Sequence, residues 1–283
     1  MLGRRKHLCH GAARIESACS SKAGCWTSSN KKEEADNMGK MGNGYGSEFH
    51  LLRYLGYHRH ELNQEVEKEI GGRVIEWLDF RPGSKEKLDR EWEGVDFVGA
   101  DSDVRTAWEK FWPQTGNVPN WDAIGRLDLN SNVEYILVEA KAHLEELRSS
   151  CGASKKGGLE TIVKALATTI KANGFNKDVK DVKDWLTPYY QYANRIAHLH
   201  FLLEHHIPAR LVFIYFCGDD WRNKTLKGKP PNCPKDARGW DAALKKMYEH
   251  LGLERQSELE KRIHSMFLDV RGNAVSLDKQ RQL

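Results

Sequence analysis

The sequence of 283 residues has no long hydrophobic run, no internal repeat and few cysteines. Its longest apolar stretch, around residues 211–217, is far shorter than the roughly 18 residues that a membrane-spanning helix needs. A hydrophobic content of 40% and a charged content of 30% exclude a disordered or collagen-like chain. The length is sufficient for a sizeable core. We therefore expect a soluble, folded protein with no membrane partner.

The chain also lacks an excess of one charge once its first forty residues are set aside. The formal net charge of +4 comes from 44 basic and 40 acidic residues. Residues 1–40 contain eight of the basic and four of the acidic residues, which leaves 36 of each from Met41 onward. Bulk charge therefore gives no argument for nucleic-acid binding, and a basic surface would have to come from local placement.

Residues 1–40 are rich in Ser and Gly and show almost no apolar periodicity. We expect a disordered leader, either a non-functional extension ahead of a start at Met38 or Met41 or, less favoured, an organelle transit peptide. Three of the six cysteines lie there, without the spacing of a structural zinc site. The other three are scattered, which fits a reducing compartment and a cytoplasmic location.

Residues 41–283 are expected to form a single α/β domain, because strand patterns alternate with helix patterns. Apolar spacing, prolines and glycines predict strands over 73–80 and 210–217. The same signals predict helices over 47–56, 60–72, 103–112, 158–174, 188–206, 240–252 and 258–268.

The segment 121–142 is the most informative part of the chain. Two β-rich runs flank the sequence Asn-Ser-Asn at 130–132, which predicts a β-hairpin. In the second run, Glu139 and Lys141 share a face with Tyr135 and Leu137, and the opposite face carries the apolar residues Ile136, Val138, Ala140 and Ala142. A carboxylate and an ammonium on a half-buried face are costly unless they are paired or bind a ligand.

The hairpin register decides what faces these two side chains. A two-residue turn at Asn130-Ser131 puts Asp122 opposite Glu139, and a turn one residue later puts Asp122 opposite Lys141. An unbulged three-residue turn would put Asp122 on the other face. Two opposed carboxylates repel each other unless a cation lies between them. The pattern therefore outlines a site for a hard divalent cation such as magnesium.

Asp122, followed after sixteen residues by Glu139-Ala140-Lys141 on a hairpin, resembles the PD-(D/E)XK nuclease superfamily, which has the restriction-endonuclease-like fold. The order of elements over 47–217 is similar, and 188–217 looks like the helix and strand of RecB-type members, whose helix carries a Gln near its start. The resemblance implies an αβββαβ core with a mixed central sheet. Outside it lie peripheral helical insertions near 84–118 and 144–187 and C-terminal helices from about 236. Trp121 stands where the superfamily pattern has proline.

The resemblance implies magnesium-dependent hydrolysis of phosphodiester bonds in nucleic acid, with DNA as the favoured substrate and manganese able to replace magnesium. Asp122, Glu139 and the main-chain carbonyl of Ala140 would hold the metal, and Glu48 would be an additional ligand.

The resemblance also implies roles for three basic or polar side chains. Lys141 would orient the attacking water or help it lose a proton. In the helix, Gln191 would position that water or Lys141, and Arg195 would contact phosphate. A homodimer is a possible assembly.

Two other interpretations stay open. The chain is either a catalytically idle nuclease-like module that binds nucleic acid or a protein, or a structural α/β domain in which Asp122 points away from Glu139. Basic residues such as Lys155-Lys156 form either a DNA-contacting arm or a solvated face. Histidines at 198–206 fall on different sides of one helix, which favours a structural role over a metal cluster, and core packing is the default for the tryptophans.

Overall fold

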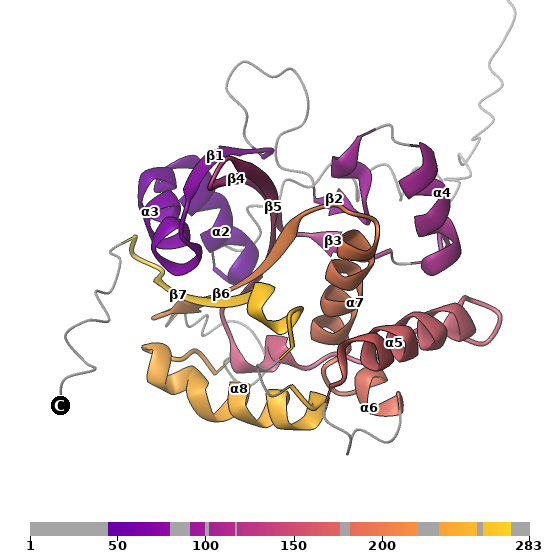
Figure 1. Ribbon diagram of the computed structural model, residues 1–283. Helices are drawn as coiled ribbons and strands as arrows, with labels where there is room; N and C mark the ends of the chain where they lie inside the picture. The colour runs from indigo at the N-terminus through magenta and orange to yellow at the C-terminus, as the bar shows by residue number, and fades with distance from the viewer. Residues whose placement is uncertain are drawn as a thin grey trace, which may run out of the picture. The chain divides into compact units, whose positions relative to one another are not determined.

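Five strands form one mixed sheet at the centre of the fold (Figure 1): β1 (Arg73–Trp77), β4 (Ala123–Leu129), β5 (Asn132–Lys141), β6 (Ala209–Cys217) and β7 (Ile263–Asp269). They lie in the order β1-β4-β5-β6-β7, antiparallel from β1 to β5 and parallel from β5 to β7. The computed structural model describes residues 45–79, 91–99, 102–116, 118–175, 182–219, 232–253 and 257–272. The predicted leader, 1–40, lies outside these residues.

Helices cover both sides of the sheet (Figure 1). On one side, α2 (Ser47–Gly56) and α3 (Arg59–Ile70) pack against the strands. On the other side lie α5 (Leu159–Asn173), α7 (Tyr190–Glu204) and α8 (Ala237–Leu251). The smaller elements are β2 (Trp92–Glu93), η1 (Asp96–Val98), α4 (Ser102–Phe111), β3 (Asn120–Trp121), η2 (Leu144–Leu147), α6 (Lys183–Leu186) and η3 (Glu260–Arg262). The mixed α/β class predicted from the sequence is confirmed.

The two faces of β5 are as the residue alternation predicts. The apolar face packs under α2 and α3, and its members are Ile136, Val138, Ala140 and Ala142. Leu137 belongs to the core on the α7 side, and Tyr135 packs against that core. Glu139 and Lys141 therefore face α7, because side chains alternate along a strand.

The β4–β5 hairpin has the first of the two registers considered for the site. Ala123 pairs with Val138, which is the register in which an unbroken ladder would put Asp122 opposite Glu139. The turn is Asn130-Ser131, whose φ angles of 54° and 67° are both positive, as a type I′ turn requires. The register that would put Asp122 opposite the lysine is excluded.

The main chain is irregular at Asp122, which lies between β3 and β4. The Asp122 N–H donates to the Val138 carbonyl at 3.1 Å, although the register pairs Val138 with Ala123. Two consecutive residues therefore face one residue of β5, which is the arrangement of a β-bulge. A bulge turns the side chain beside it, and here it lets the Asp122 carboxylate accept a hydrogen bond from the Ala140 N–H at 2.8 Å.

The C-terminal part differs from its prediction. The helix expected over 240–252 is confirmed as α8, but the helix expected over 258–268 is wrong, because 263–269 form β7. Met266 and Leu268 pack on the α2 side, whereas Ile263 and Phe267 pack on the α7 side. This period of two lets β7 pair with β6, and that tertiary pairing outweighs the helix-favouring residues before it.

The two segments predicted as insertions, near 84–118 and 144–187, pack against the α7 side in their described parts. Trp108 and Trp112 lie 4.4 and 4.8 Å from His198 of α7 between ring centroids. Ile162 and Leu166 of α5 are buried in the same core. In the part of the chain that the structure describes, no helix is long and apolar enough to cross a membrane.

The turn gives a test of the register. We expect Ser131→Gly to raise the free energy of unfolding by about 0.5–1 kcal/mol, because glycine adopts a positive φ without strain. Ser131→Val is expected to lower it by about 1–2 kcal/mol. Urea denaturation of the three proteins measures both changes. Equal stabilities would contradict the turn, and with it the hairpin register that pairs Ala123 with Val138.

Candidate active site

A buried carboxylate, Glu139, is the centre of the candidate site. It is 1% exposed and lies near the end of β5. Its Oε1 accepts a hydrogen bond from Lys141 Nζ. Its Oε2 accepts from Arg195 of α7, at 2.8 Å from Nε and 2.7 Å from Nη2. Each carboxylate oxygen thus has a cationic partner, and a buried charge needs such partners to be tolerated.

Arg195 connects α7 to Glu139 of β5 and to the main chain of β3. It is 4% exposed, and beyond Glu139 it donates from Nη2 to the Asn120 carbonyl of β3 and from Nη1 to Asn194 Oδ1 at 2.8 Å. Its guanidinium also lies over the Trp121 ring, 5.1 Å from the centroid. These contacts favour a role in holding Glu139 and the chain before Asp122. A direct contact between Arg195 and phosphate stays a prediction.

Gln191 reaches the site from the first turn of α7. Its Oε1 accepts a hydrogen bond from Lys141 Nζ at 3.0 Å, which is the contact expected of a residue that positions the lysine. Its own N–H donates to Ser149 Oγ at 2.7 Å. A side chain from the loop after β5 therefore fixes the start of α7, and with it the position of Gln191.

The charges of the site shift its pKa values in opposite directions. Burial and then the charge of Glu139 raise the pKa of Asp122 to about 7. Burial would raise the pKa of Glu139, but Arg195 and Lys141 lower it below its ordinary value. Burial would lower the pKa of Lys141, but Glu139 and Asp122 raise it. Asp122 is thus the carboxylate with the least compensation from neighbouring cations.

The donor atoms fit a hard cation in type. Asp122 and Glu139 supply carboxylate oxygens that repel each other, and a divalent cation would remove that repulsion. The Ala140 N–H faces Asp122, and in an extended strand the carbonyl of the same residue points to the same neighbour. No group of three or more His, Cys, Asp or Glu among the described residues is arranged to hold a metal ion. The candidate set is therefore two carboxylates and one main-chain carbonyl.

Glu48, the additional metal ligand that the resemblance implies, lies on a different element from these residues. It is an exposed residue in the first turn of α2, the helix that covers the opposite face of the sheet. Its role as an additional metal ligand stays a prediction.

Sequence reasoning missed a second charged cluster, which follows the candidate site along β5. Asp219, after β6, lies with Oδ2 at 3.2 Å from His50 Nε2 and 3.3 Å from His143 Nε2. The other ring nitrogen of His143 lies 2.7 Å from Glu146 Oε1. The signal was weak, because His143 and Glu146 follow Lys141 closely but Asp219 and His50 are far away in sequence. The cluster ties the start of α2 to the end of β5.

His198 of α7 lies in an aromatic part of the core. His198 is buried, its Nδ1 lies 2.6 Å from the Asn194 carbonyl, and the rings of Trp108, Trp112 and Trp121 pack around it. Burial lowers its pKa to about 3, so the ring is neutral. The tryptophans are core residues, as expected, and the packing favours the structural interpretation of His198.

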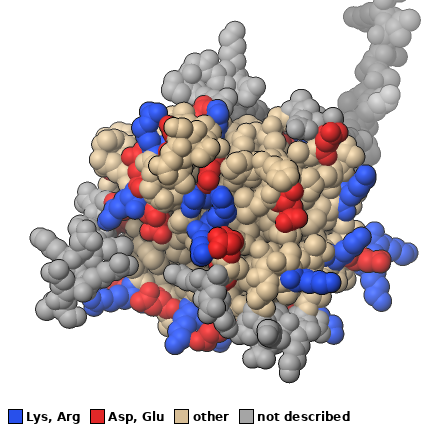
Figure 2. Space-filling model, in the orientation of Figure 1, with Lys and Arg blue, Asp and Glu red and all other residues tan. Residues whose placement is uncertain are grey.

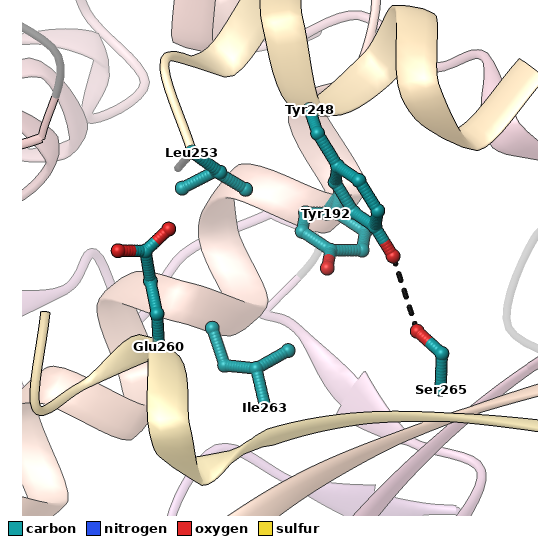
Figure 3. Close-up of a pocket in the computed structure, with 6 residues that line it drawn as sticks. All are labelled: Tyr192, Tyr248, Leu253, Glu260, Ile263 and Ser265. Atoms are coloured by element: carbon teal, nitrogen blue, oxygen red, sulfur yellow. Dashed lines mark hydrogen bonds between the residues drawn. The ribbon is translucent and has the colours of Figure 1, made fainter. Parts of the chain in front are cut away.

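A small cavity lies between α7, α8 and β7 (Figure 3). Its volume of about 20 Å³ has room for a single water. The Tyr248 hydroxyl and Ser265 Oγ are hydrogen-bonded across one side at 3.1 Å. The cavity is therefore too small for a substrate, and the predicted site residues do not line it.

Comparisons of the chain with models of protein families, with curated proteins and with solved structures found no match. The functional assignment therefore depends on the geometry of the site.

The His143 cluster predicts a pH dependence of stability. Burial would lower the pKa of His143, but its bonds to Asp219 and Glu146 raise it from 6.5 to about 9. A pKa raised by folding means that the bound proton stabilises the fold fully below pH 6.5, and that this contribution is lost as pH rises through about 9. We expect His143→Gln to cost about 1–3 kcal/mol of unfolding free energy below pH 6.5 and clearly less above pH 9.

Urea denaturation at both pH values measures this difference. His60→Gln, at an exposed position of α3, is the matched control and should have little effect at either pH. A cost of His143→Gln that does not change with pH would refute the assignment of a bound proton to this ring.

Proposed function

We propose that the chain is a metal-dependent nuclease of the PD-(D/E)XK type, with a restriction-endonuclease-like core formed by α2, β1, β4, β5, α7 and β6. Its reaction is the hydrolysis of phosphodiester bonds in nucleic acid, with DNA as the favoured substrate. One observation carries the proposal. The Asp122 carboxylate accepts a hydrogen bond from the N–H of Ala140, the residue between Glu139 and Lys141, while Gln191 of α7 bonds the Lys141 ammonium.

Each of these residues has a task that its contacts support. Asp122, Glu139 and the Ala140 carbonyl would hold magnesium, with manganese able to replace it. When bound, the ion would polarise a phosphate and lower the pKa of a water molecule. Lys141 carries its ammonium beside Glu139, where it can orient that water and stabilise negative charge that develops on the phosphate.

Gln191 and Arg195 of α7 would position the other groups of the site. Gln191 accepts a hydrogen bond from Lys141 and so limits where its ammonium lies. Arg195 fixes Glu139 Oε2 and the main chain at Asn120, two residues before Asp122. Small errors in such positions are costly, because reacting groups must be aligned closely for attack on phosphorus.

Substrate binding by this chain would have to be local. Figure 2 shows Lys and Arg interspersed with Asp and Glu on the face drawn, without one large field of a single sign. This agrees with the equal numbers of acids and bases from Met41 onward. Phosphate contacts near the site, and the metal itself, would therefore supply most of the attraction.

One observation favours the alternative of a catalytically idle module. Both oxygens of Glu139 already have cationic partners, Lys141 and Arg195, so this carboxylate is neutralised without a metal. In that case the site would be a structural ion-pair network, and the chain would bind nucleic acid or a protein without cleaving it.

Cleavage of supercoiled plasmid in the presence of magnesium distinguishes the nuclease from the idle module. We expect wild type to nick or linearise the plasmid, and Asp122→Asn and Lys141→Met each to lower the rate at least about 100-fold, because each removes a group that acts on the reacting atoms. Asp128→Asn is the matched control, since Asp128 lies at the other end of β4 beside the turn.

Folding of each variant is checked by its urea midpoint. Equal rates in wild type and in both site variants would remove the assigned mechanism. No cleavage by wild type with magnesium or manganese would favour the idle module.

A further inference from the structure

A large cavity lies on the α7 side of the sheet, beside the start of α7. Its volume is about 590 Å³, within the range of about 300–1,000 Å³ that small-molecule pockets have. Tyr190 of α7, Trp112 after α4 and the loop 150–157 line it. We call it the Tyr190 cavity.

The Tyr190 cavity is joined to the site through two routes. Along the chain, Tyr190 precedes Gln191, which bonds Lys141, and Ser149 beside the lining loop accepts the Gln191 N–H. Through side chains, Asn194 lies one turn after Tyr190 on α7, and Asn194 Oδ1 accepts from Arg195, the partner of Glu139. A ligand in the cavity would therefore lie beside the helix residues that hold Lys141 and Glu139.

The lining has the chemistry that a nucleobase needs. Tyr190 is partly exposed and offers an aromatic ring for stacking. Gly152, Ala153 and Gly157 are small, so main-chain polar groups can approach the edge of a flat ligand. Ser150 and Ser154 add hydroxyl groups.

Charge at the rim fits a phosphate backbone. Lys155 and Lys156 are both exposed, and they lie between the lining residues Ser154 and Gly157. Figure 2 shows basic side chains at the edge of the molecule where α5 lies, the helix that begins just after this loop. The segment that the sequence left as an arm or a solvated face therefore borders a cavity.

We propose that the Tyr190 cavity receives the unpaired base of a nucleotide that flanks the cleaved phosphate, with Lys155 and Lys156 on the adjoining backbone. The inference rests on the proposed nuclease function and narrows its substrate to single-stranded or locally unpaired nucleic acid. A base inside a duplex cannot enter such a cavity without being unstacked and turned out.

Gly152→Trp tests the cavity directly. A Cβ at Gly152, a lining residue, meets nothing within 4 Å and its φ lies outside the left-handed region, so an indole fits there without strain in the main chain. Gly56→Trp is the matched control, because Gly56 is exposed, equally open, and lies at the end of α2 on the other side of the sheet. Urea midpoints confirm that both variants fold.

The substrate side of the test is a scan with abasic nucleotides. A labelled single-stranded DNA oligonucleotide is cleaved with magnesium, with the base removed at one position at a time around the cleaved bond. We expect one flanking position at which base removal slows cleavage by wild type and by Gly56→Trp about 5- to 150-fold. Gly152→Trp should cleave the intact oligonucleotide more slowly by a similar factor and should show no further loss at that position.

The outcomes separate the cavity from the catalytic proposal. Two results overturn the inference and leave the nuclease proposal standing. One is that wild type cleaves the oligonucleotide at the same rate whichever base is removed, and the other is that removal of one base slows Gly152→Trp as much as it slows wild type. If wild type cleaves no nucleic acid, the cavity is tested by binding instead. Fluorescence anisotropy measures the affinity of the same oligonucleotide without metal. Weaker binding by Gly152→Trp than by Gly56→Trp supports the cavity, and equal or undetectable binding by both overturns it.

The rim lysines give a second measurement. Replacing Lys155 and Lys156 together by Gln should lower the dependence of oligonucleotide affinity on salt, by about 0.7 in log–log slope for each phosphate that the two ammonium groups neutralise in wild type. An unchanged slope would remove the two lysines from the proposed surface.

Discussion

The rest of the site depends on one interaction, the buried carboxylate of Glu139 held between Lys141 and Arg195. Burying an isolated charge at 1% exposure would cost a prohibitive amount of free energy. Here each oxygen of Glu139 has a cationic donor. Because Arg195 also bonds the Asn120 carbonyl, the same guanidinium fixes α7, β5 and the chain before Asp122. Removing one member of such a buried set leaves the others uncompensated, so the arrangement specifies one geometry more than it adds stability.

Two further groups keep that geometry in place. On the α7 side, three tryptophans pack around the neutral His198, and Trp121 contacts both His198 and Arg195. On the α2 side, Asp219 and Glu146 hold His143 just beyond Lys141. The site is thus supported from both faces of the sheet, which is what precise positioning of reacting groups requires.

The sequence was sufficient for the two faces of β5, because these follow from the period of two in a strand. It left two hairpin registers open, and the positive φ angles at Asn130-Ser131 decide between them. It could not predict that Arg195 would pair with Glu139, because that contact spans 56 positions and depends on how α7 packs. The strand β7 was missed for the same kind of reason, since pairing with β6 overrides its local signals.

The central claim is that Asp122 and Glu139 form a cation site whose geometry the hairpin and Arg195 fix. A crystal structure of the protein soaked with manganese, with anomalous scattering data, tests it most directly. The account predicts an anomalous peak in contact with both carboxylates and with the Ala140 carbonyl, and no such peak in Asp122→Asn. A protein that crystallises with Lys141 and Arg195 still holding Glu139, and with no manganese at this position, would contradict it.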